Sequence, residues 1–182
     1  MIIFETDRLV VRAFTEHDKK NFYLLNGNRR VMQWIRPVKT RKESDEFLRE
    51  TLARIENDPA MGRWAVEEKS SGKFVGTFAI IPVENSEHIQ LGYALLPKYW
   101  GKGYASELTR TGLHYVFSKT KLKVIYALTE LPNLSSQKVL IKTGFTENGI
   151  VKEGKKELVQ FSMSREEFLT MAGIQNLGVK PV

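Results

Sequence analysis

Apolar and polar residues recur with two different periods along the 182-residue chain, and these periods predict its elements. Stretches with strand-like alternation, or short β-rich apolar runs, predict strands at residues 8–14, 63–67, 73–81, 89–96, 123–129, 145–152 and 157–163. Apolar stripes with helical spacing predict helices at residues 15–26, 40–56, 105–118 and 133–143, and a terminal turn at 165–171. Because the two kinds of element interleave, the chain is predicted to be a mixed α/β sheet protein.

Local signals mark where several of these elements begin and end. Thr15 with Asp18, and Thr40 with Glu43, have the spacing of a capping box, which begins a helix. Asp58-Pro59 ends the second of these helices. One side of that helix is expected to be buried, and it carries Phe47, Leu48, Leu52 and Ile55.

Length and composition favour one globular domain over residues 1–170, followed by a C-terminal tail over 171–182 that is expected to fray from residue 176. The chain has no cysteine, so disulfides, cysteine zinc sites and cysteine nucleophiles are excluded. No other metal-ligand spacing is present, and no metal is expected. The sequence starts without a signal-peptide pattern and has no apolar run long enough to span a bilayer, so we expect a cytoplasmic protein with no membrane partner.

The formal net charge is +7, which suits a nucleic acid, an acidic membrane surface or a polyanionic small molecule. The basic residues are scattered rather than gathered in one segment, so a generally basic solvated surface explains the charge equally well. The chain shows no recognisable nucleic-acid-binding motif, and no nucleic-acid partner is expected.

Residues 100–105 form a glycine-bearing turn between a predicted strand and a predicted helix, with the sequence Trp-Gly-Lys-Gly-Tyr-Ala. Free backbone N–H groups and the helix dipole favour phosphate at such a point. The third glycine and the early position of a dinucleotide-binding fingerprint are missing, as is the lysine motif of phosphate-loop hydrolases. Glycine turns before helices are common, so the turn taken alone favours an ordinary connection over a phosphate site.

Several motifs in combination are more specific. Residues 91–97, Leu-Gly-Tyr-Ala-Leu-Leu-Pro, lead into the glycine turn, and a helix opening Asn133-Leu134-Ser135-Ser136 and ending at 142–145 follows the next strand. Residues 6–12 and 161–168 match in the same way. Together these motifs, over residues 5–168, resemble the GCN5-related N-acetyltransferase superfamily, and within it the RimJ/RimL-like branch. The resemblance implies an α/β (α+β) fold with a single mixed, mostly antiparallel central sheet of six to seven strands flanked by helices.

The resemblance further implies that acetyl-coenzyme A is the co-substrate. The turn would hold its pyrophosphate through Trp100, Gly101, Lys102, Gly103, Tyr104 and Ala105, where Trp100 replaces the family's Gln or Arg. In this fold the preceding strand splays from its neighbour through a bulge, and main-chain groups of Leu95 and Leu96 would pair with the pantetheine arm. The N–H of Leu95 or Leu96 would also polarise the thioester carbonyl. Asn133 is placed to contact the same arm, or simply to cap its helix.

The catalytic assignments also come from the resemblance. Many family members have a tyrosine acid at the position of Leu140, and in the RimJ/RimL-like branch a serine at the position of Ser136 is thought to protonate the departing thiolate. The alternative is that Ser136 is an ordinary helix residue. The branch often has a glutamate at the position of Gln90, so His88 becomes the candidate base. The alternatives are an exposed histidine without a role, and water as the proton acceptor.

The predicted activity is acetyl transfer to a primary amine, by direct attack in a ternary complex. The acceptor is either a protein N-terminus or a small molecule, and Trp34 and Trp64 are expected either to line its pocket or to pack in the core. A homodimer is possible, because dimers occur in the branch. Since Gln90 and Leu140 replace reactive residues, a non-catalytic coenzyme A-binding module is the alternative function; a nucleic-acid-binding domain is a more distant one.

Overall fold

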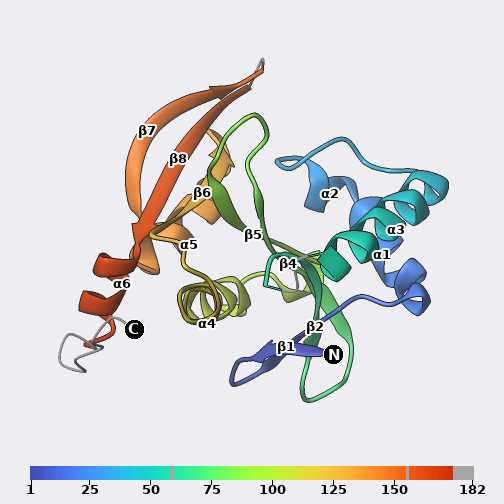
Figure 1. Ribbon diagram of the computed structural model, residues 1–182. Helices are drawn as coiled ribbons and strands as arrows, with labels where there is room; N and C mark the ends of the chain where they lie inside the picture. The colour runs from blue at the N-terminus through green and yellow to red at the C-terminus, as the bar shows by residue number, and fades with distance from the viewer. Residues whose placement is uncertain (58–59, 155, 174–182) are drawn as a thin grey trace.

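The computed structural model describes residues 1–57, 60–154 and 156–173. Within these residues the strands form one open sheet of eight, in the order β1-β2-β3-β4-β5-β6-β8-β7 (Figure 1). The predicted mixed α/β fold is therefore confirmed, with a slightly larger sheet than expected. The strands are β1 (Ile2–Glu5), β2 (Leu9–Arg12), β3 (Gly62–Glu68), β4 (Phe74–Pro82), β5 (Ile89–Leu95), β6 (Val124–Glu130), β7 (Thr146–Glu153) and β8 (Lys156–Ser164).

The additional strand is β1, which the sequence did not predict. Its four residues are too few to show a clear alternation, and it forms by pairing with β2 at the edge of the sheet. A register shift between Ile2 and Phe4 interrupts this pairing. The strand thus depends on its neighbour rather than on a pattern of its own.

All neighbouring strands run antiparallel except β5 and β6, which run parallel. A parallel pair requires a long crossover, and here α4 (Tyr104–Lys119) supplies it. The pairing of β5 with β6 consists of a single residue pair, Gln90 with Tyr126. Beyond this pair the two strands separate, and the sheet is split toward the end of β5.

Helices cover both faces of the sheet. The 3₁₀ turn η1 (Glu16–Asp18) leads into α1 (Lys19–Asn26), and Figure 1 shows α1 gathered with α2 (Arg29–Met32) and α3 (Arg41–Asn57) on one side of the sheet. The other elements are the short 3₁₀ turn η2 (Pro97–Tyr99), α5 (Leu134–Lys142) and α6 (Arg165–Met171).

The predicted apolar side of α3 faces the core. Leu48 is fully buried there, and Phe47 and Leu52 pack partly buried against the same core. The side chain of Ile55 lies outside the described part of the chain, as does the tail from residue 174. The division into a single domain and a tail stays a prediction.

Two glycines allow close contacts with β4, one from the helix α4 and one from the neighbouring strand β5. A Cβ atom at Gly112 of α4 would lie 2.3 Å from the ring of Phe78, so this helix rests directly on β4. A Cβ atom at Gly76 of β4 would lie 2.1 Å from the carbonyl oxygen of Ala94 in β5. These contacts fix β5 and α4, the two elements that flank the glycine turn, against the same strand.

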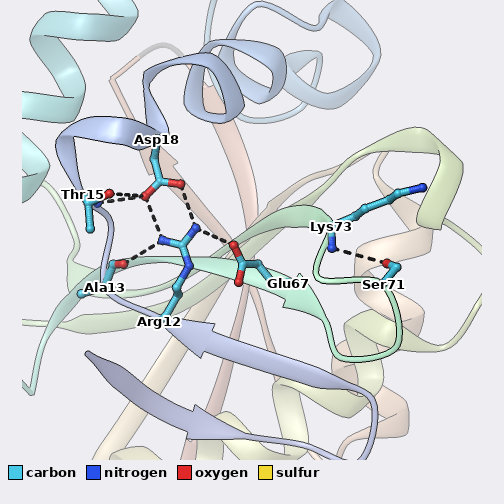
Figure 2. A network of polar contacts seen from close by, with 7 residues as sticks. All are labelled: Arg12, Ala13, Thr15, Asp18, Glu67, Ser71 and Lys73. Atoms are coloured by element: carbon cyan, nitrogen blue, oxygen red, sulfur yellow. Dashed lines mark hydrogen bonds and ion pairs between the residues drawn. The ribbon is translucent and has the colours of Figure 1, made fainter.

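An ion-pair network ties the start of α1 to the sheet (Figure 2). Arg12 donates two hydrogen bonds of 2.8 Å to Asp18 and a third bond to Glu67 of β3. The carboxylate of Asp18 also accepts the N–H of Thr15, which completes the predicted capping box. Burial acts to raise the pKa of Asp18, but the hydrogen bonds and charge of Arg12 and the bonds from Thr15 outweigh it and lower the pKa below its usual value.

We therefore expect Asp18→Asn to destabilise the protein by roughly 2–4 kcal/mol at pH 7, because it leaves Arg12 partly buried without its main partner. A carboxyl whose pKa is lowered on folding stabilises the protein above its unfolded pKa of about 3.9, and this contribution is lost as pH falls through the folded pKa. Urea unfolding of both proteins should show the difference closing below about pH 4. Asp7→Asn, on the exposed turn before β2, is the control. A difference that persists at acid pH would contradict the assignment.

Candidate active site

A cavity of about 520 Å³ lies at the split between β5 and β6. It is lined by consecutive residues of β5 from Leu91 to Leu95, whose side chains alternate between the two faces of the sheet. Tyr93 is in register with Phe78, and the side chains of this row lie on the face covered by α4. Gly92 is in register with Ala79 and Arg63, and this row lies on the opposite face, which α3 covers. The cavity therefore continues through the split from one face of the sheet to the other.

Each side of the cavity has its own set of elements. On the α4 side the lining comes from the glycine turn, α4, β6 and α5. On the other side it comes from α2 and the turn that follows, from Arg30 to Ile35. A built Cβ at Gly92 meets nothing within 4 Å, so the strand itself leaves room on the α2 side.

The main chain of β5 presents unpaired positions to the split. The N–H of Leu96 donates to the carbonyl of Val75 in β4 at 2.9 Å. Because successive residues of a strand direct their N–H groups to opposite sides, the N–H of Leu95 points away from β4, into the split. Of the two predicted leucines, only Leu95 is oriented to polarise a carbonyl group, and Leu96 is not among the residues that line the cavity.

The predicted bulge in this strand is not present in its pairing with β4. The register runs without a shift from the Gly76–Leu95 pair to the Pro82–Ile89 pair. The separation instead arises on the other edge of β5, where the pairing with β6 stops after one residue pair. The predicted split is therefore confirmed, but the predicted bulge in the pairing with β4 is wrong.

Trp100 closes one end of the split. Its indole N–H donates to the carbonyl oxygen of Leu95 at 2.7 Å, and the guanidinium of Arg30 lies 5.2 Å from its ring centre. Trp100 as a whole residue is 43% exposed and lines the cavity. In this chain, the residue that replaces the family's Gln or Arg therefore holds the end of β5 and faces the ligand space at the same time.

The glycine turn has the backbone geometry expected of a phosphate site. Gly101 and Gly103 have φ angles of +72° and +79°, which disfavour any side chain, and α4 begins directly afterwards at Tyr104. Gly101, Gly103, Tyr104 and Ala105 line the cavity. Lys102 does not, because its ammonium group lies over the ring of Tyr99 at 5.1 Å; Lys98 contacts the same ring.

Arg8 holds the turn in place, a role that the sequence did not predict. Its guanidinium donates to the carbonyl of Lys102 at 3.0 Å and to Glu107 of α4 at 2.7 Å, and it lies 4.5 Å from the ring centre of Tyr104. The phenol of Tyr104 in turn donates to Glu68 at 2.6 Å. The only available signal was that Arg8 belongs to the family-like opening of residues 6–12.

Ser136 faces Tyr93 across the cavity. Their hydroxyl oxygens lie 3.2 Å apart, on α5 and β5 respectively, and both residues line the cavity. Burial raises the pKa of the Tyr93 phenol above its usual value, and the hydrogen bond to Ser136 only partly offsets this. Tyr93 is therefore a neutral hydroxyl at physiological pH. Leu140, at the position of the family's tyrosine, is buried.

Two other polar residues line the same cavity. Asn133 caps α5, since its side-chain oxygen accepts the N–H of Ser136 at 3.3 Å. Thr129 of β6 has a buried hydroxyl without a hydrogen-bond partner among the described residues. A ligand in the cavity can satisfy this hydroxyl, and sequence reasoning gave no reason to single it out.

His88, the predicted base, is not among the residues that line the cavity. Its ring stacks on Tyr126, with centroids 3.9 Å apart, beyond the closed end of the split that Gln90 forms with Tyr126. It lies five residues from Tyr93, about 16 Å along an extended strand. The assignment of His88 as a base stays a prediction, and no contact with the cavity supports it.

The two tryptophans have different roles. Trp34 lines the cavity on the α2 side, as one of the two alternatives proposed. Trp64 is fully buried in the core, where it stacks on Phe78 and meets the ring of Tyr115 edge-on. Only Trp34 is therefore available to an acceptor.

Two kinds of feature are absent from the described residues. In the described ranges, no helix is both long and apolar enough to cross a bilayer. No group of three or more histidine, aspartate or glutamate residues in those ranges is arranged to hold a metal ion.

Comparison with known proteins accounts for this arrangement. Residues 8–146 match the family model of the acetyltransferase (GNAT) domain. The uncharacterized N-acetyltransferase YoaA of Bacillus subtilis is 25% identical over 154 residues, covering 83% of this chain and 86% of YoaA.

Two solved structures share the fold. RimL, a ribosomal L7/L12 alpha-N-protein acetyltransferase in complex with coenzyme A, has a TM-score of 0.76 at 15% identity, over 90% of this chain and 98% of RimL. A spermidine N-acetyltransferase of Vibrio cholerae, in complex with coenzyme A and spermine, has a TM-score of 0.72 at 22% identity, over 88% of this chain and 98% of that one. With a split sheet, a glycine turn that opens α4 and a family match over most of its length, the chain belongs to the acetyltransferase (GNAT) family.

Proposed function

We propose that the protein transfers an acetyl group from acetyl-coenzyme A to a primary amine by direct attack in a ternary complex. The observation that carries this proposal is the continuity of the cavity, which joins the glycine turn on one face of the sheet to α2 on the other. A donor and an acceptor can thus enter from opposite faces and meet beside Leu95. Such an arrangement supplies proximity and orientation without a covalent enzyme intermediate.

The residues on the α4 side suit coenzyme A. The N–H groups of Gly101 to Ala105 and the start of α4 offer a pyrophosphate site, and positive φ angles keep that backbone free of side chains. The split edge of β5 offers main-chain groups to an extended amide arm, and Asn133 and Thr129 add polar side chains. Lys138 and Lys142 of α5 also line the cavity and provide positive charge.

Acetyl-coenzyme A supplies an activated thioester, and the protein supplies hydrogen bonds and a proton. The N–H of Leu95 donates to the carbonyl oxygen of the acetyl group, where negative charge develops. As the amine nitrogen forms a bond to the acetyl carbon and the carbon–sulfur bond breaks, Ser136 donates its proton to the departing sulfur. Tyr93, neutral and 3.2 Å from Ser136, replaces that proton and regains its own through water, which takes up the proton released by the amine nitrogen.

The lining of the cavity favours an amine that needs no enzymic base. Among the described residues that line it there is no aspartate, glutamate or histidine. An α-amine, with a pKa of about 8, has a substantial free-base fraction at neutral pH, whereas an alkyl amine with a pKa of about 10.4 has almost none. We therefore favour an α-amine, such as that of a protein N-terminus or an amino acid, with water as the final proton acceptor.

The alternative is a coenzyme A-binding module without catalysis. The replacement of the expected glutamate by Gln90 and the absence of an acidic or histidine side chain from the lining favour it. Release of free coenzyme A in the presence of peptides, amino acids and polyamines decides between the two functions. Turnover with any amine supports the enzyme, and tight binding of acetyl-coenzyme A without turnover on the whole panel supports the module. A cytoplasmic location and a homodimer remain predictions.

The glycine turn can be tested by substitution at one position. We expect Gly101→Ala to weaken acetyl-coenzyme A binding roughly ten- to hundredfold, because a side chain at positive φ distorts the amides that face the pyrophosphate. Isothermal titration calorimetry measures this. The matched control is Gly72→Ala, since Gly72 also has positive φ and open space around it but lies in the hairpin between β3 and β4. Equal affinities in the two variants would remove the turn from the site.

The hydroxyl pair can be tested separately from binding. We expect Ser136→Ala to lower kcat roughly 10- to 100-fold with little change in acetyl-coenzyme A affinity, because the departing sulfur loses its proton donor. Tyr93→Phe should lower kcat by a smaller factor, since Tyr93 acts through Ser136. Ser135→Ala, a neighbour that also lines the cavity, is the control. Unchanged kcat in Ser136→Ala would assign proton delivery to water.

A further inference from the structure

A group of basic side chains surrounds Phe47 of α3 on the α2 side of the sheet. The guanidinium groups of Arg36 and Arg63 lie 4.8 and 5.6 Å from the centre of its ring, and the ammonium group of Lys39 lies 5.1 Å from it. Arg54 of α3 is close enough to Arg63 to affect its titration. These four residues, Arg36, Lys39, Arg54 and Arg63, form what we call the Phe47 basic cluster.

Among the described residues no salt bridge joins the cluster to a carboxylate, although the exposed Glu43 lies close enough to Lys39 to be affected by its charge. Each of the six salt bridges recorded there involves other side chains, and neither arginine that contacts Phe47 has a carboxylate partner. The Nε atom of Arg36 is buried and without a hydrogen-bond partner in the described structure. Burial, and then repulsion from Arg36 and Arg54, lowers the pKa of Arg63 to about 9.

This arrangement is unfavourable for the free protein. Partly buried guanidinium groups lose hydration, like charges repel, and stacking on Phe47 offsets only part of that loss. Arg12 shows the contrast, because on the same strand pair its guanidinium is fully engaged by Asp18 and Glu67. Unsatisfied donors of this kind are complementary to a carboxylate or a phosphate group.

The cluster adjoins the part of the cavity left for the acceptor. Arg36 directly follows Ile35, which lines the cavity together with Gln33 and Trp34. Arg63 pairs with Ala79, and Ala79 pairs with Gly92, so the three form one row across β3, β4 and β5. Two strand spacings place Arg63 about 10 Å from Gly92, which an arginine side chain spans in large part. Ala79 and Gly92 present no bulky side chain along this row.

We propose that the Phe47 basic cluster binds an anionic group of the acceptor, so that the preferred substrate is an amine that also carries a carboxylate or phosphate. This inference rests on the proposed function and deepens it by naming the class of acceptor. The amine lies beside Leu95 and the anion at Arg36 and Arg63; two strand spacings and three residues along β5 separate the backbone of Arg63 from that of Leu95 by about 14 Å. Polyamines are disfavoured, because a second ammonium group would meet the cluster and Arg30.

The test compares amines of one chain length that end in a carboxylate, a phosphate, a neutral carboxamide or a second ammonium group. For the wild-type protein we expect kcat/KM for an anionic amine to exceed that for the carboxamide roughly ten- to hundredfold, because the neutral carboxamide cannot accept charged hydrogen bonds as a carboxylate or phosphate does. The diamine should be poorest. The ratio of kcat/KM for the amine that ends in a carboxylate to that for the amine that ends in a phosphate shows which anion is preferred.

Variants assign the preference to the cluster. Arg36→Gln and Arg63→Gln should lower kcat/KM for the anionic amine to nearly that of the carboxamide, and kcat/KM for the carboxamide should fall by a much smaller factor. Arg36→Lys and Arg63→Lys, which keep the charge, should retain part of the preference. Arg110→Gln, an equal charge change on an exposed part of α4, is the control and should keep all of it.

Thermal unfolding checks that each variant is folded. Because removal of one like charge relieves repulsion, neither glutamine variant should lose stability, in contrast to an arginine with a structural role. Equal kcat/KM for anionic and neutral amines in the wild type, or a preference that survives in both glutamine variants, overturns the inference and leaves the acetyltransferase assignment standing.

A binding measurement decides the inference even if no amine is acetylated, an outcome that would count against the proposed function alone. A dicarboxylate of the same length is titrated calorimetrically into the complex of the protein with coenzyme A. Saturable binding that weakens roughly tenfold in Arg63→Gln supports the cluster as an anion site. No binding to the wild-type complex overturns it.

Discussion

The separation of β5 from β6 is the constraint on which the rest of the site depends. A parallel pairing that stops at Gln90 and Tyr126 leaves the edge of β5 unpaired toward Leu95, in the middle of a sheet whose other neighbours are paired over longer stretches. Unpaired main-chain groups in a protein interior require partners. A ligand with amide groups can supply them, and for this reason we propose the interruption in the sheet as the binding site of the coenzyme A arm.

The surrounding structure keeps that interruption in one geometry. Gly76 lets β4 approach β5 closely on the paired side, and Gly112 lets α4 rest on the same strand. On the open side, Trp100 bonds to the carbonyl of Leu95. Arg8 connects the glycine turn to Glu107 and Tyr104, so the N-terminal strands support a loop that lies more than ninety residues later in the chain.

Charge is distributed differently on the two faces. On the α4 side, the ionic groups that position the turn are mutually satisfied, as Arg8 is with Glu107 and Tyr104 with Glu68. On the α2 side, Arg36 and Arg63 are left without carboxylates among the described residues. Satisfied ion pairs hold a loop in position, and unsatisfied donors recognise a ligand. The proposed donor half thus resembles a structural framework, and the proposed acceptor half a recognition surface.

The sequence by itself determined most of the elements, the fold class and the glycine turn, because these depend on periodicity and on residues with special backbone preferences such as Gly101 and Gly103, whereas the short β1 and α2 were not predicted. It also identified Ser136 and Asn133 through a family-like motif that is contiguous in the chain. It placed Leu95 and Leu96 together, but only strand pairing shows that the N–H of Leu96 is occupied by Val75 and that of Leu95 faces the split.

The tertiary structure alone decided which distant residues meet. Tyr93 and Ser136 are 43 residues apart, Arg8 and Lys102 are 94 apart, and Arg36 and Arg63 come from a loop and a strand. It also separated His88 from the cavity, although His88 lies on the same strand as Tyr93. Local propensity acts over a few residues, whereas these contacts depend on how strands pair and helices pack across the whole sheet, which no local pattern encodes.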